Sequence, residues 1–351
     1  MSLSWMASAS CMSNWRISTV LWLIATVTRS VIQAAKFDYE FRMPGVRTQK
    51  DDAYLCYGEL IDGNTSYITG FKPIHDEEVT HHMILFGCNE PGSEEKVWSC
   101  DGGPMSDPVC KGTFTIIFSW AMNAPSFTMP PDTSFPIGGD GYKYLVLQVH
   151  YKDASAFQNA PEKKDTSGWK LSMQTTPTKY LAGVYLFVTD GQIEPNGDTT
   201  VQVACRYTGS AVLHPIAFRV HAHSHGVVNE AFLFHNGKRY LIGSKSPQEK
   251  QTFYPVENKT LTVHPDDVMM ARCNMTNQEN RVIYMGNTRM DEMCNFYMMY
   301  VVDSADAAQL HDRYNQQCFS DGNENLNLSS FIDESQDESD VDEDYDPYWE
   351  F

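Results

Sequence analysis

The sequence predicts an all-β protein built from two tandem β-sandwich domains. Short runs rich in β-branched and aromatic residues recur along most of the chain, and Gly, Pro, Asn and Asp separate them. Few windows sustain the periodicity of an amphipathic helix. Short strands divided by turn residues are typical of β-sandwiches. The clearest predicted strands are Phe114–Phe118, Tyr144–His150, Val184–Val188 and Phe296–Tyr300.

Chain length and cysteine positions predict the division into two domains. A chain of 351 residues is too long for one ordinary core. We place an N-terminal domain at 36–161 and a C-terminal domain at 162–320, because the cysteines that follow Cys11 divide evenly around the polar stretch 153–168. An even cysteine set in an exported chain predicts disulfides, although eight cysteines allow 105 pairings. These cysteines are Cys56, Cys88, Cys100, Cys110, Cys205, Cys273, Cys294 and Cys318.

Residues 1–35 are predicted to be a secretory signal peptide. They contain no acidic residue, and Arg16 precedes an apolar run, Ile17–Val27, that small residues follow. This run is short for a membrane span, so an uncleaved anchor is the weaker alternative. We therefore expect a soluble glycoprotein in the secretory pathway, either stored in secretory granules or secreted. Its candidate glycosylation sites are Asn64, Asn258, Asn274 and Asn327.

Charge limits the partners of the chain. The formal net charge is −19, and ten of the acidic residues fall between Asp333 and Phe351. Residues 321–351 are predicted to be a disordered acidic tail, in which Tyr345 is a candidate for sulfation. The remainder is still acidic, which argues against nucleic acid or an anionic membrane as a partner.

The stretch Phe218–His223 contains the first group of candidate functional side chains. As a β-strand it would turn Arg219, His221 and His223 to one face. Two imidazoles so spaced can hold one metal ion, and the guanidinium beside them can bind a carboxylate. A pair of structural, hydrogen-bonded histidines is the alternative.

A second histidine group lies in the first half of the chain. His81 and His82 are adjacent, so on a regular strand they face opposite sides. They can share one metal ion only through an irregular backbone or through different ring nitrogens. His150, which shares a strand face with Gln148, completes a trio. Three histidines without a thiolate suit copper or zinc.

Met293 is a candidate soft ligand. It precedes Cys294, which a disulfide would hold in place. A thioether favours Cu(I) and is unusual for zinc. The chain has 17 methionines, so spacing alone does not distinguish Met293 from a packing residue.

Five motifs together resemble the peptidylglycine α-hydroxylating monooxygenases, which are copper type II, ascorbate-dependent enzymes. The motifs occur in that family's order and at closely similar spacing, within roughly Phe41 to Cys318. The resemblance implies two jelly-roll β-sandwiches with one copper ion on each, facing an interdomain cleft. The motifs are His81–Cys88, Leu147–Tyr151, Arg219–His223, Tyr254–Glu257 and Asp291–Tyr297.

The resemblance also implies residue roles. An electron-storing copper would be held by His81, His82 and His150. The catalytic copper, which uses O2, would be held by His221, His223 and Met293. The terminal carboxylate of a peptide would be bound by Arg219, Asn295 and Tyr297. Gln148 matches a residue near the first copper. The implied disulfides are Cys56–Cys100, Cys88–Cys110, Cys205–Cys318 and Cys273–Cys294.

The implied activity is hydroxylation of the α-carbon of a peptide's C-terminal glycine, the first step of peptide amidation in neuropeptide processing. Two copper ions, ascorbate and O2 would take part, and the substrates would be glycine-extended peptides. We expect a monomer, and a separate amidating lyase acting on the product, because too few residues follow Cys318 for a lyase domain. The chain departs from the family at Ser224, which stands before His225 where a histidine is usual.

Three other interpretations stay open. A hydroxylase of a small amine, like dopamine β-monooxygenase, would share the copper ligands but would have no use for a carboxylate clamp. A secreted copper-binding or peptide-binding protein would show no turnover. A zinc hydrolase would be reactivated by zinc and not by copper.

Overall fold

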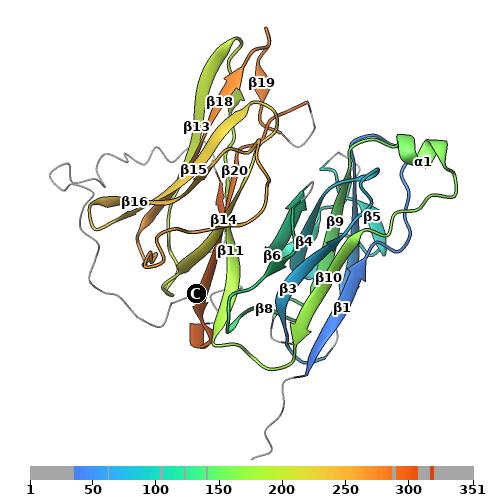
Figure 1. Cartoon of the computed structure of the whole chain (residues 1–351), viewed down its shortest axis with the longest axis horizontal. Helices are drawn as coiled ribbons and strands as arrows, with labels where there is room; N and C mark the ends of the chain where they lie inside the picture. Colours follow the sequence, from blue (N-terminus) through green and yellow to red (C-terminus); the bar gives the residue numbers. More distant parts are fainter. Residues whose placement is uncertain are drawn as a thin grey trace, which may run out of the picture. The chain divides into compact units, whose positions relative to one another are not determined.

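The computed structural model is nearly all β, which confirms the predicted fold class (Figure 1). It describes residues 35–306 and 317–319, apart from 62, 103–105, 122–123, 140 and 287–289. The predicted signal peptide, except Ala35, and the predicted acidic tail with Asn327 and Tyr345 lie outside these residues. No helix among the residues described is long and apolar enough to cross a membrane.

Among the residues described, the elements follow one another as short strands with one five-residue helix. In chain order they are β1 Lys36–Arg42, β2 Ala53–Leu60, β3 Ser66–Ile74, β4 Thr80–Pro91, β5 Val97–Ser99, β6 Cys110–Ala121, β7 Phe127–Thr128, β8 Thr133–Ile137, β9 Tyr144–Tyr151, α1 Ser155–Asn159, β10 Gly168–Gln174, β11 Tyr180–Val188, β12 Gln192–Ile193, β13 Gly197–Arg206, β14 His214–His221, β15 Gly226–His235, β16 Lys238–Lys245, β17 Tyr254–Pro255, β18 Val268–Asn277, β19 Ile283–Tyr284, β20 Asn295–Asp303 and β21 Gln317–Phe319. The four clearest predicted strands fall within β6, β9, β11 and β20.

The strands assemble into four sheets. The longest, here called the long sheet, has the order β1-β10-β3-β8-β11-β20-β14-β17, with β7 on β3 and β21 on β11. The others are β5-β2-β9-β4-β6, β13-β18-β15-β16 and the small pair β12-β19. Parallel pairing of β8 with β11 makes the long sheet continuous from one half of the chain to the other. All these strands belong to one compact unit.

The two largest apolar cores lie between the sheets. In the first, the five-stranded sheet packs on β1, β10 and β3, and the rings of Phe71 and Phe118 stack with centroids 4.3 Å apart. In the second, β11, β20 and β14 pack on the four-stranded sheet, and Phe218 stacks on Phe296 at 5.5 Å. Burial of each such side chain contributes about 1.5–3 kcal/mol. This arrangement is consistent with two β-sandwiches, whereas the jelly-roll topology and the boundary at 161/162 stay predictions.

Four disulfides tie these layers together, with the pairings that the resemblance implies: Cys56–Cys100, Cys88–Cys110, Cys205–Cys318 and Cys273–Cys294. The bridge from Cys273 to Cys294 joins β18 to the residue just before β20. It therefore holds the chain beside Met293 against the four-stranded sheet.

Candidate functional site

The first histidine group lies where β4 and β9 pair. His82 is opposite His150 in this antiparallel register, and the register shifts between Thr80 and His82. This β-bulge is the irregular backbone that two adjacent histidines need in order to serve one site. The ligand nitrogens of His81, His82 and His150 all lie within 4.8 Å of one another.

The three imidazoles converge through the same ring atom. Nδ1 of His150 lies 3.1 Å from Nδ1 of His81 and 3.4 Å from Nδ1 of His82. Nε2 of His150 faces Oδ1 of Asp52 at 3.0 Å, so the carboxylate accepts the Nε2–H and leaves the Nδ1 lone pair for the cluster. The Tyr54 ring stacks on His150 at 4.1 Å and fixes its plane.

Burial keeps this group neutral. It lowers the pKa of His81 to about 4, and the pKa of His82 lies well below its ordinary value for the same reason, with nearby imidazoles adding to both shifts. Burial also lowers the pKa of His150, although Asp52 opposes the change. Neutral imidazoles are the form that binds a metal ion. Three converging lone pairs without a thiolate fit copper or zinc.

The second group lies at the end of β14, and the prediction of a strand through His223 was wrong. The strand ends at His221, and His223 lies in the connection to β15. Its backbone N–H donates to the carboxylate of Glu292 instead of to a neighbouring strand. The rings of His221 and His223 still meet edge to face, with centroids 5.4 Å apart.

Hydrogen bonds leave the same nitrogen free on both of these rings. Nδ1 of His221 lies 2.7 Å from Oε1 of Gln251, and Nδ1 of His223 lies 2.8 Å from the carbonyl oxygen of Asp291. Both partners are acceptors, so each Nδ1 carries the proton and each Nε2 keeps its lone pair. Burial, reinforced by the charge of Arg219, lowers the pKa of His221 to about 3.

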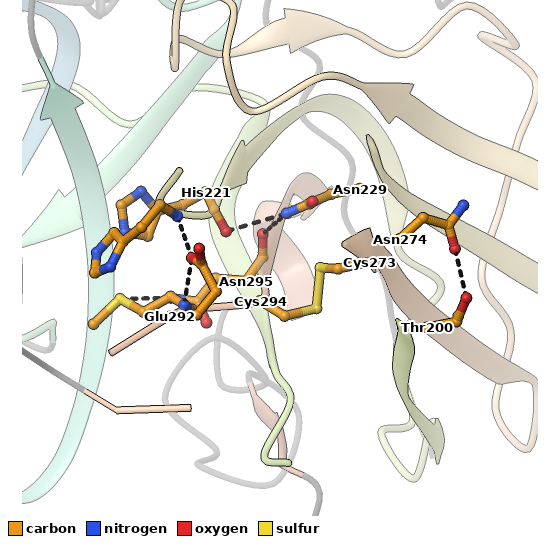
Figure 2. Close-up of a disulfide and its surroundings, with 10 residues drawn as sticks. Thr200, His221, Asn229, Cys273, Asn274, Glu292, Cys294 and Asn295 are labelled. Carbon is orange, nitrogen blue, oxygen red and sulfur yellow. Dashed lines mark hydrogen bonds between the residues drawn. A yellow bond between two sulfur atoms is a disulfide. The ribbon is translucent and has the colours of Figure 1, made fainter. Parts of the chain in front are cut away.

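In the sequence, Met293 stands between Glu292 and the disulfide-bonded Cys294, both labelled in Figure 2, and it lies two residues before the start of β20. The Asn295 amide points at its sulfur, with Nδ2 3.9 Å from Sδ. Two free imidazole nitrogens and a thioether would suit Cu(I) better than zinc.

Arg219 is a buried cation opposite Tyr297. The two residues pair across β14 and β20, and the guanidinium carbon lies 4.9 Å from the centre of the Tyr297 ring. Arg219 is only 3% exposed, and its Nε donates to the carbonyl of Gln251 at 2.9 Å. Burial lowers the pKa of Arg219, although a guanidinium stays charged at neutral pH. Asn295 pairs with His221 in the same register.

One cavity of about 540 Å³ is lined by residues of both groups. The ring centroids of His82 and His221 lie 6.2 Å apart. Apolar side chains such as Phe86 and Trp120 form other parts of the wall. The predicted site residues that line the cavity are His82, Gln148, Arg219, His221, Met293, Asn295 and Tyr297.

Several residues that hold the candidate ligands were not predicted. Asp52 and Gln251 each fix a histidine ring from far along the chain, so no local motif identifies them. Glu292 belongs to the motif Asp291–Tyr297, but its contacts are made with the connection that follows β14. His225, for which the sequence predicts no role, faces Glu292 with Nδ1 and Glu279 with Nε2.

Comparison with known proteins gives matches over most of the chain. Residues 39–158 match the N-terminal domain, and residues 180–331 the C-terminal domain, of copper type II ascorbate-dependent monooxygenases. Peptidyl-glycine alpha-amidating monooxygenase B of Xenopus laevis is 39% identical over 290 residues, which cover 80% of this chain and 32% of the relative. The Mus musculus peptidyl-glycine alpha-amidating monooxygenase is 38% identical over 281 residues, covering 79% and 28%.

Human dopamine beta-hydroxylase is more distant, at 25% identity over 289 residues, covering 74% of this chain and 45% of the relative. The chain spans about a third of the length of the amidating relatives. Among solved structures, the major capsid protein P2 of bacteriophage PM2 aligns with a TM-score of 0.30 and 10% identity. The alignment covers 77% of this chain and 97% of that one, and the similarity is too weak to indicate a relationship.

Proposed function

This chain belongs to the copper type II, ascorbate-dependent monooxygenases, and from that premise we propose that it hydroxylates the α-carbon of the C-terminal glycine of peptides. The observation that carries the proposal is the position of Arg219. A buried guanidinium shares one cavity with His221 and Met293, and Tyr297 and Asn295 line the same cavity. A cation so placed suits a substrate that ends in a carboxylate.

Two groups of side chains would hold one copper ion each. We assign the electron-storing ion to His81, His82 and His150, and the catalytic ion to His221, His223 and Met293. Bound copper, cycling between Cu(II) and Cu(I), would supply the one-electron chemistry by which ascorbate reduces O2. Overall, one C–H bond, O2, two electrons and two protons give one C–OH group and water.

The protein's own part is to bind and orient the peptide. Arg219 would form charge-assisted hydrogen bonds with the terminal carboxylate, and Tyr297 and Asn295 would fix its orientation. Holding the chain end sets the distance from the glycine α-carbon to the ligands His221 and Met293. Such positioning contributes to rate by removing unproductive orientations. We assign no residue as a general base, because hydrogen-atom abstraction needs none.

The test is product analysis on a glycine-extended peptide. Copper-loaded protein with ascorbate and air should add one oxygen atom to the peptide, as measured by mass spectrometry. The same peptide with its terminal carboxylate amidated is the control, and it should react poorly because Arg219 has no anion to bind. An unchanged glycine-extended peptide would contradict the proposal.

Dopamine hydroxylation is the competing activity, since a dopamine beta-hydroxylase is among the relatives. A phenethylamine has no carboxylate for Arg219. We therefore expect turnover of the peptide to exceed turnover of dopamine at equal concentration, and the reverse ranking would favour the amine hydroxylase.

The cellular setting follows from the same proposal. Disulfides and the amidating relatives are consistent with the secretory pathway. We propose secretory granules as the site of action, and a monomer as the active form. The product, a peptidyl-α-hydroxyglycine, is what an amidating lyase would cleave, and the separate lyase stays a prediction.

A further inference from the structure

We propose that Glu292 is a positioning residue that holds His223 and Met293 in place from behind the catalytic copper site. The inference rests on the proposed function, because it concerns the ligand set assigned there. Glu292 itself would touch neither the metal nor the substrate.

The Glu292 carboxylate is wholly enclosed by protein. Its side chain is 0% exposed, a rare setting for an acid unless its oxygens are fully hydrogen-bonded. Oε1 accepts the backbone N–H of His223 and, at 2.7 Å, that of Met293. Oε2 accepts the backbone N–H of His225 at 2.9 Å and faces Nδ1 of the same residue at 3.1 Å. Figure 2 shows the Glu292 side chain with dashed hydrogen bonds at its carboxylate.

Oε1 of Glu292 is shared by two candidate copper ligands, His223 and Met293. Because Oε1 binds both N–H groups, it ties the main chain of one candidate ligand to that of another across a separation of 70 positions. His223 lies beyond the end of β14 and Met293 lies before the start of β20, so strand pairing stops short of both. The last ladder pair is His221 with Asn295, which Asn229 also bridges by donating to both carbonyl oxygens.

Glu292 is itself held firmly. Its N–H donates to the carbonyl of Tyr284 at 2.9 Å, and its own carbonyl accepts the N–H of Gly286 at 3.0 Å. The adjacent disulfide at Cys294 anchors the other side. His225 extends the contact outward, with Nε2 3.3 Å from Oε1 of Glu279. A carboxylate fixed in this way can define where two loops stand.

Glu292→Gln weakens this link with little change in volume. An amide oxygen accepts more weakly than a carboxylate oxygen, and the new NH2 group faces either the N–H of His225 or the two N–H groups of His223 and Met293. Mutation of a residue that hydrogen-bonds to metal ligands typically lowers metal affinity 10- to 100-fold. We expect roughly that loss of copper affinity at the site of His221, His223 and Met293, with the affinity of the other histidine trio unchanged.

The experiment titrates Cu(I) into the full-length wild-type, Glu292→Gln and Glu230→Gln proteins against a chromophoric chelator. X-ray absorption of the loaded proteins then reports sulfur bound to copper. Glu230 pairs with Arg272 on the four-stranded sheet, so Glu230→Gln is the matched control, which should keep two sites and the sulfur signal. Glu292→Gln should lose affinity at one site and lose the sulfur signal. A merely structural role would lower thermal stability without moving either readout.

The outcomes separate the two proposals. Wild-type protein without a second copper or without a sulfur signal would overturn the assigned catalytic site, and this inference with it. Wild-type protein with both, together with an equally competent Glu292→Gln, would overturn this inference alone. If Glu292→Gln does not fold, Glu292→Asp keeps the charge but retracts it by one methylene. That variant should also bind copper more weakly at one site, and unchanged affinity would again reject the role.

Discussion

At the scale of single residues, we propose that Arg219 selects a substrate that ends in a carboxylate. Arg219→Gln replaces a charged donor by a neutral one, and loss of a charge-assisted hydrogen bond costs about 1.5–3 kcal/mol. We therefore expect the KM for a glycine-extended peptide to rise by roughly 10- to 100-fold. Steady-state kinetics check this, with thermal unfolding as a control for the buried position. An unaltered KM would remove Arg219 from the clamp.

Met293 is the proposed ligand whose sulfur would favour copper over zinc. Met293→Ile keeps an apolar side chain of similar size but removes the soft sulfur. Hydroxylation should be abolished, while the copper of His81, His82 and His150 stays bound. Activity assay and copper content measured on one preparation test both halves. Full activity in this variant would show that the sulfur is not a required ligand.

The contact of Asp52 with His150 could not be predicted from the sequence. The φ of Asp52 is +54°, a backbone region that Asn tolerates nearly as well as Asp, so Asp52→Asn isolates the loss of charge from backbone strain. Without the carboxylate, the proton on Nε2 of His150 is held less firmly. Copper affinity of the histidine trio should fall about tenfold, while the site with Met293 is unaffected. Two-site copper titration measures both values, and equal weakening at both sites would contradict the assignment.

At the scale of elements, the chain's local pattern identified the strands but not their ends. The predicted run Tyr144–His150 lies within β9, and Phe296–Tyr300 lies within β20, because both runs are mostly apolar and buried. The strand predicted through His223 stops at His221. The backbone N–H of His223 donates instead to the carboxylate of Glu292, 69 residues further along the chain. No local periodicity could therefore have revealed where the strand ends.

The adjacent histidines of β4 also show that local sequence does not determine strand irregularities. Alternation of side chains on a regular strand would send His81 and His82 to opposite faces. A register shift against β9 brings both to His150. The sequence allowed for such an irregularity without locating it, because a bulge is set by pairing with a distant strand. Motif resemblance identified the candidate ligands, whereas the residues that hydrogen-bond to them, such as Asp52 and Gln251, follow only from long-range contacts.

At the scale of the whole molecule, several buried neutral histidines should make the metal-free protein sensitive to mild acid. In the unfolded chain a histidine takes up a proton near pH 6.5, whereas burial lowers the folded-state pKa of His81 to about 4 and that of His221 to about 3. At pH values between the folded-state and the unfolded-state pKa, the unfolded chain binds more protons than the folded protein. Stability is therefore fully present above about pH 6.5 and declines as the pH falls toward the folded-state values.

The decline is about 1.4 kcal/mol per pH unit for each histidine that stays neutral in the folded state. Urea unfolding of the metal-free protein at pH 7.5 and at pH 5 measures it. This window lies above the ordinary titration of Asp and Glu, so paired carboxylates such as Asp76 contribute little to the difference. His81→Gln removes one titrating ring and should reduce the pH dependence. Equal unfolding free energies at the two pH values in the wild-type protein would contradict the buried, neutral state of these imidazoles.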